Sequence, residues 1–79
     1  MKTLNPTVKT KWEGKQPLFY VQIFTRDFRV LGFLNGTTNG LGNVYKASGF
    51  QTEQAAKDAF QKSRYLRGQI LDNFTNHNS

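Results

Sequence analysis

Apolar and small residues recur in steps of three and four between Gln51 and Phe74, the longest regular pattern in the sequence. Polar and charged residues fill the positions between them, so the pattern predicts an amphipathic helix. The face that we expect to pack on the rest of the protein holds Ala55, Ala56, Ala59, Phe60, Ser63 and Leu66. Because a helix of this length cannot bury its own apolar face, another part of the chain must cover it.

Both ends of this helix carry sequence signals. Thr52 is a good N-cap, and Glu53 suits the positive end of the helix dipole. The basic residues that suit the negative end are Lys62, Arg64 and Arg67. We expect the helix to run from Thr52 to about Arg67, with Gly68 as its C-cap. The periodicity also continues beyond the glycine and would support a further turn or two, through Ile70, Leu71 and Phe74.

Stretches before the helix have the β-branched and aromatic composition that is typical of strands. They are Thr7–Trp12, Leu18–Thr25, Phe28–Asn35 and Val44–Ser48. The third is either a separate strand or a sharply bent continuation of the second. The segment Asn35–Asn43 contains two Asn-Gly pairs and predicts a hairpin loop before the last strand.

The length of 79 residues allows one small domain, residues 1–79, which we expect to have an ordered core from about 7 to 74 and frayed termini. The elements predict an α+β fold, a three- or four-stranded antiparallel β-sheet packed against one C-terminal α-helix. One helix covers only one face of a sheet. In the second strand the residues of one face are Phe19, Val21 and Ile23, and those of the other are Tyr20, Gln22 and Phe24.

The charge balance is the first indication of function. Eleven Lys and Arg residues against five Asp and Glu give a net charge of +6, which is typical of domains that bind phosphates. The chain has no cysteine and a single histidine, His77, so we expect no metal and no cofactor. No apolar run approaches the roughly 20 residues that span a bilayer, and no secretory signal is visible. We therefore expect a cytoplasmic protein that does not contact membranes.

The uncovered face of the sheet allows two interpretations. Loops or Trp12 cover it, or it is an exposed platform of basic residues around aromatic side chains. The members of that platform are Lys9, Lys11, Trp12, Arg26, Arg29 and Lys46. Such a surface would enter a major groove as a β-ribbon or stack unpaired bases.

Two segments resemble a known DNA-binding family. The stretch "SGFQTEQAAKDAFQKSRYLRGQILDNF" (Ser48–Phe74) is similar to the end of the plant ethylene-response-factor, or APETALA-type, domain, which also occurs in phage-borne homing endonucleases. The likeness lies in a glycine and an aromatic residue before threonine, an acidic and alanine-rich helix start, and a closing glycine and "LDNF". The stretch "VKTKWEGK" (Val8–Lys15) is similar to the family's first strand. The arm-binding domains of tyrosine-recombinase integrases share the three-strand-plus-helix plan.

The resemblance implies that the helix braces a sheet whose outer face docks on double-stranded DNA. It also implies an origin in a phage or another mobile element. The implied phosphate and base contacts are Lys9, Lys11, Trp12 and Lys15, to which the spacing of basic residues adds Arg26 and Arg29. Lys9 and Lys11 stand where the family has arginines, so point charges replace side chains that read guanine through two hydrogen bonds.

A second class of function also fits these features. The chain would then be a small phage-type inhibitor or regulator that binds an acidic host protein through the basic aromatic face. We expect no enzymatic activity, because the acidic residues form no catalytic pair. The glycine-rich loop at Asn35–Asn43 also lacks the following helix of a nucleotide-binding loop.

Overall fold

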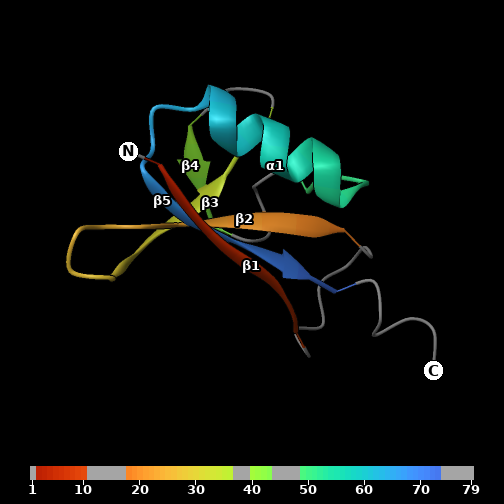
Figure 1. Cartoon of the computed structure of the whole chain (residues 1–79), viewed down its shortest axis with the longest axis horizontal. Helices are drawn as coiled ribbons and strands as arrows, with labels where there is room; N and C mark the ends of the chain where they lie inside the picture. The colour runs from red at the N-terminus through yellow and green to blue at the C-terminus, as the bar shows by residue number, and fades with distance from the viewer. Residues whose placement is uncertain (1, 11–17, 37–39, 44–48, 74–79) are drawn as a thin grey trace.

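The computed structural model describes residues 2–10, 18–36, 40–43 and 49–73. Within these ranges the chain forms a five-stranded sheet with one helix packed on it (Figure 1). In chain order the elements are β1 (Thr3–Lys9), β2 (Phe19–Phe24), β3 (Val30–Leu34), β4 (Leu41–Gly42), α1 (Glu53–Lys62) and β5 (Arg67–Asp72). The strand order is β1-β5-β2-β3-β4. β1 is parallel to β5, and the other neighbouring strands are antiparallel.

The last strand, β5, lies between β1 and β2 and uses both of its edges. Its Gly68 is opposite Leu4 of β1 and Ile23 of β2. β1 is an edge strand, which tolerates Pro6 because no ladder partner needs an N–H on its outer side. The register of β1 against β5 shifts between Asn5 and Val8, around this proline. The Pro6 carbonyl accepts a hydrogen bond of 3.2 Å from the Gln69 side chain.

Local capping sets both ends of the helix. The Thr52 hydroxyl accepts a hydrogen bond of 3.0 Å from the backbone N–H of Ala55, as an N-cap side chain does. At the other end, Ser63 leaves the helical conformation, and its hydroxyl donates to the Phe60 carbonyl at 2.7 Å. The serine thus satisfies a carbonyl that has no partner inside the helix, and α1 ends at Lys62.

Lys2 from the start of the chain also caps this helix end. Its ammonium group donates to the carbonyls of Phe60 and Tyr65, both at 2.9 Å, and to that of Ser63. It also lies 4.9 Å from the centre of the Phe60 ring. A cation at a helix C-terminus is stabilising because the carbonyls there carry the negative end of the dipole. Lys2 directly precedes β1, so these hydrogen bonds connect the start of β1 to the C-terminal end of α1, although the two are far apart in the sequence.

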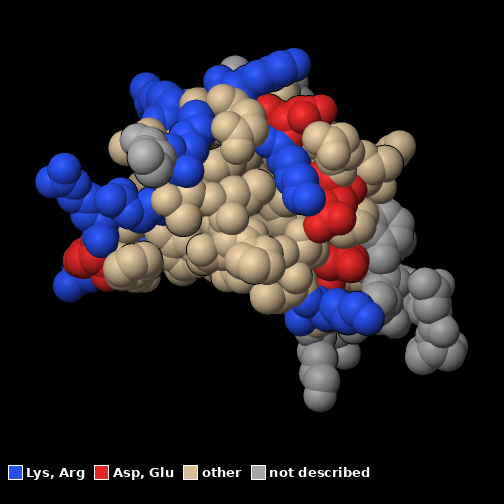
Figure 2. Space-filling view, viewed as in Figure 1, with Lys and Arg blue, Asp and Glu red and all other residues tan. Residues whose placement is uncertain are grey.

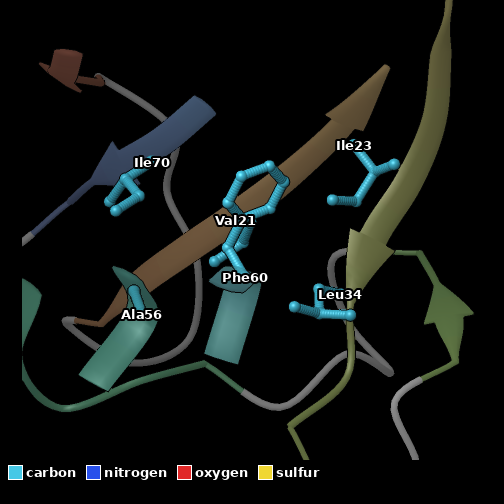
Figure 3. Close-up of a cluster of buried hydrophobic side chains, with 6 residues drawn as sticks. All are labelled: Val21, Ile23, Leu34, Ala56, Phe60 and Ile70. Atoms are coloured by element: carbon cyan, nitrogen blue, oxygen red, sulfur yellow. The ribbon is translucent and has the colours of Figure 1, made fainter. Parts of the chain in front are cut away.

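The core lies between the helix and one face of the sheet. Figure 3 shows the Phe60 ring directed from α1 toward β2, with residues of β5 and β3 beside it. The fully or almost fully buried members are Val21, Ile23, Leu34, Ala56, Phe60 and Ile70. Gly68 lies directly under the ring, and a Cβ there would approach the Phe60 ring carbons to 2.8 and 3.0 Å.

The α+β class is confirmed, but the predicted arrangement is wrong. The sheet has five strands and is mixed, where three or four antiparallel strands were expected, and the helix lies between β4 and β5, not at the C-terminus. The helix stops before Arg67, and Gly68 is a buried strand residue instead of its cap. Ala55 and Leu66 were expected in the packed face, but both are exposed, Leu66 by 47%. The reason is that Ser63 and Lys2 end the helix early, which leaves the following residues free to pair with β1 and β2.

The strand predictions succeed in part. β2 and β3 are separate strands within the expected ranges, and Val21 and Ile23 face the core as the alternation predicts. The first strand begins earlier than expected, at Thr3. The loop predicted over Asn35–Asn43 contains the short strand β4. The strand expected at residues 44–48 and the tail at 74–79 lie outside the described residues. In the described part of the chain, no helix is long and apolar enough to cross a membrane.

Replacing Gly68 by Ala should lower the free energy of unfolding by about 1 to 3 kcal/mol, because the new methyl group would overpack against Phe60. In a Phe60→Leu background the smaller side chain should relieve most of this penalty. Urea denaturation of the two single variants and the double variant measures the coupling. An equal cost of Gly68→Ala in both backgrounds, as a helix-capping glycine would give, contradicts the packing.

Replacing Lys2 by Met should cost about 1 to 3 kcal/mol, because it removes charge-assisted hydrogen bonds and retains the apolar stem of the side chain. The matched control is Lys57→Met. Lys57 is exposed, and its ammonium lies 3.9 Å from the Glu53 carboxylate, one helical turn away. Such a pair contributes about 0.2 to 0.5 kcal/mol. Equal losses of stability in the two variants would argue against the capping role of Lys2.

Candidate functional site

The turn between β2 and β3 is held together by its own polar side chains. The Phe28 N–H donates to the Thr25 carbonyl at 3.0 Å, and the Thr25 N–H donates to the Arg29 carbonyl at 2.8 Å. The Thr25 hydroxyl bonds to the Asp27 carboxylate and accepts from the Arg29 N–H at 3.0 Å. The Arg29 guanidinium lies 3.1 Å from the same carboxylate. These contacts hold the turn, which is exposed to solvent, in one conformation.

Phe28 occupies an unusual position in this turn. Its φ is +64°. Among the described residues, Phe28 is the one residue other than glycine that has a positive φ. Hairpins of this kind place a residue in the left-handed region after a type I turn, and glycine is the usual choice. A left-handed conformation costs an ordinary residue roughly 1 to 2 kcal/mol. The side chain is also 76% exposed, so burial does not offset that cost.

Phe28 borders a small hollow of about 110 Å³. Its lining residues come from three strands and this turn, and are Thr3, Asn5, Phe24, Phe28, Arg67 and Gly68. In the sheet register Thr3 is opposite Arg67, and the next pair along the two strands is Leu4 and Gly68. Leu4 points toward the core, so the side chains of Thr3 and Arg67 point to the other face. The hollow therefore opens on the face of the sheet that the helix does not cover.

The other end of this open face is more closed. Tyr20 is only 5% exposed, and its ring meets the Phe33 ring edge-on, with the ring centres 6.3 Å apart. Burial raises the pKa of the Tyr20 phenol above its ordinary value, because the charged form is desolvated there. This face is thus buried around Tyr20 and open at the hollow beside Phe24, while Trp12, which was expected either to cover the face or to join the platform, lies outside the described residues.

Charge is unevenly distributed over the surface. Figure 2 shows Lys and Arg side chains gathered at the end of the molecule that carries the β2–β3 turn and the end of α1. We call this surface the basic pole, and its members are Arg26, Arg29, Lys62, Arg64 and Arg67. Asp27 lies within it. The remaining described acidic residues, Glu53, Asp58 and Asp72, belong to the first turns of the helix and the end of β5.

The structure brings together only some of the residues predicted as a site. Arg26 and Arg29 are exposed neighbours in the β2–β3 turn. Lys9 is exposed at the opposite end of the sheet, because it pairs with Asp72, which pairs with the first residue of β2. The other predicted contacts lie outside the described residues, and they are Lys11, Trp12, Lys15 and Lys46.

Sequence reasoning missed the residues that complete this site. Arg67 was assigned to the end of a helix, and Phe24 and Phe28 were seen only as strand residues. A usable signal was present in "FTRDFR" (Phe24–Arg29), where a polar turn sequence joins two apolar strands. The left-handed conformation of Phe28 has no signal in the sequence, because phenylalanine is not a residue that favours it.

No group of acidic residues and histidine that could hold a metal is found among residues 2–10, 18–36, 40–43 and 49–73. Comparisons with family models, curated proteins and solved structures find no match for the chain. The resemblance to the APETALA-type domain therefore stays a prediction.

Replacing Phe28 by Asn should raise the free energy of unfolding by about 0.5 to 1 kcal/mol, because asparagine adopts a left-handed backbone at lower cost. Little buried surface is lost, since the ring is mostly exposed. Leu31→Asn is the control, because Leu31 is also exposed, at 51%, but has no positive φ. A clear loss of stability in Phe28→Asn, measured by urea denaturation, would mean that the ring is needed for folding.

Proposed function

We propose that this chain is a small basic DNA-binding module that contacts phosphates through the basic pole. The observation that carries the proposal is the separation of charge: besides Lys2, five basic side chains lie at one end, with Asp27 as the acidic residue among the described ones there. A surface of one charge sign attracts a polyanion from a distance and positions it.

The electrostatics at the C-terminal end of α1 also favour the basic pole as the surface that contacts DNA. The C-terminus of α1 points toward the basic pole, and its carbonyls would weaken the positive field there. Lys2 donates to these carbonyls and so offsets part of that negative contribution. Lys62 and Arg64 then need not cap the helix and can contact phosphate together with Arg26 and Arg67, whereas Arg29 is also paired with Asp27.

The open face next to the basic pole supports contacts beyond phosphate. Asn5, Gln69 and Gln22 are neighbours across β1, β5 and β2 in the register. Amide side chains on a sheet surface can donate to and accept from base edges. This placement agrees with the role that the resemblance implies for the outer face of the sheet. The basic residues, however, lie at one end of the sheet and not across that face.

The affinity for mixed-sequence duplex DNA should fall linearly with salt on logarithmic axes, with a slope of about −4 for four to five phosphate contacts. Changing Arg26 and Arg29 together to Gln should reduce that slope by about two. Fluorescence anisotropy titrations over a range of salt concentrations measure the effect.

The matched control changes Lys9 and Lys57 together to Gln. It removes the same charge outside the basic pole, and in each pair one residue has an acidic neighbour, Asp27 for Arg29 and Glu53 for Lys57. If DNA binds at the basic pole, the control should change the affinity and the salt slope little. Equal weakening by both pairs would contradict the basic pole, and stronger weakening by the control would favour the contact at Lys9 that the resemblance implies.

A second candidate function is binding to an acidic protein, for example by a phage-type inhibitor or regulator. Its support is a set of exposed apolar side chains close to Arg26 and Arg29, namely Phe28, Val30 and Leu31. Apolar residues beside charge are typical of protein interfaces. No detectable affinity for duplex or single-stranded DNA near physiological salt would exclude the DNA-binding proposal and favour a protein partner.

A further inference from the structure

We propose that the hollow between Phe24, Phe28 and Arg67 receives an unpaired base of single-stranded DNA. This inference rests on the proposed DNA-binding function and names the form of DNA that the site selects. Arg67 belongs both to the lining of the hollow and to the basic pole, and Phe28 lies in the turn that carries Arg26 and Arg29, so a strand held there by its phosphates passes over the hollow.

The size of the hollow limits what it can hold. Its volume of about 110 Å³ is well below the roughly 300 to 1,000 Å³ of sites for whole small molecules. It is open to solvent and accommodates part of one flat ring. A nucleotide cofactor or a folded peptide segment would not fit. A base stays attached to its strand, which remains outside the hollow. Only part of its ring needs to insert.

The lining has the chemistry that a base requires. Phe24 and Phe28 supply aromatic surfaces for stacking, and the Arg67 guanidinium both stacks and donates hydrogen bonds. The Asn5 amide and the Thr3 hydroxyl add polar groups at the rim. In an intact duplex the faces of the bases are stacked on one another, so they are not available to these rings.

The strained backbone at Phe28 provides an independent observation. A large apolar side chain is held in a left-handed conformation and is 76% exposed, although smaller polar residues adopt this turn at lower cost. Strain of this kind is concentrated at functional sites, where it positions a group for binding. Here it places the aromatic ring beside the hollow, in the turn that also carries Arg26 and Arg29.

The test compares Phe28→Asn with the unchanged protein on two probes, each titrated at the same series of salt concentrations. The probes are a single-stranded oligothymidylate of about 12 nucleotides and a duplex of the same length. Stacking of one base contributes about 1 to 3 kcal/mol, so the variant should lose roughly 5- to 150-fold in affinity for the single strand. Affinity for the duplex should change less than about 3-fold, and the salt slope should not change, because no phosphate contact is removed.

An abasic oligonucleotide of the same length provides the matched probe, because it keeps the phosphates and lacks the bases. The unchanged protein and Phe28→Asn should bind it equally well. Leu31→Asn is the matched variant, exposed but outside the hollow, and should bind both single-stranded probes as the unchanged protein does.

Equal affinity of Phe28→Asn and the unchanged protein for the thymidylate probe would overturn the inference, and salt-dependent DNA binding would then still support the proposed function. An equal loss on the abasic probe would also overturn it, because the ring would not act through a base. Absence of binding to every probe would overturn both the inference and the proposed function.

Discussion

The packing of the Phe60 ring on the bare backbone of Gly68 joins the helix to the centre of the sheet. A side chain at position 68 would meet the ring carbons at 2.8 and 3.0 Å, so glycine is what allows the ring to reach full burial against Val21, Ile23 and Ile70. Because Gly68 belongs to β5, the same contact places β5 under the helix. β5 then pairs with β1 on one edge and β2 on the other, and the rest of the sheet is built outward from this ladder.

The location of the candidate site follows from this central strand. β5 starts with Arg67, and its pairing brings that residue beside Thr3 of β1 and near Phe24 of β2. The helix ends on the side of the molecule that carries the β2–β3 turn (Figure 1), so Lys62 and Arg64 lie on the same side as Arg26 and Arg29. The basic pole is therefore assembled from three separate parts of the chain, each of which supplies only one or two of its five basic residues.

Local patterns in the sequence succeeded where neighbours along the chain decide the structure. The N-cap at Thr52, the strand around Val21 and the buried face of Ala56 and Phe60 all follow from short-range spacing. The prediction failed at Leu66 to Asp72, where steps of three and four fit a helix and the alternation of Gly68 and Ile70 fits a strand equally well. Lys2 and β1 decide between the two, and they come from the other end of the chain.

The sequence by itself determined the start of the helix at Thr52, the strands β2 and β3, the core positions of Ala56 and Phe60, the net positive charge and the closeness of Arg26 to Arg29 along the chain. These are properties of single residues and their near neighbours. Only the tertiary structure decided that β5 enters the middle of the sheet, that Lys9 lies far from these arginines, and that Arg67 lines a hollow with Phe24 and Phe28. Strand order and the left-handed Phe28 depend on long-range pairing and packing, whose free energies do not follow from the spacing of residues along the chain.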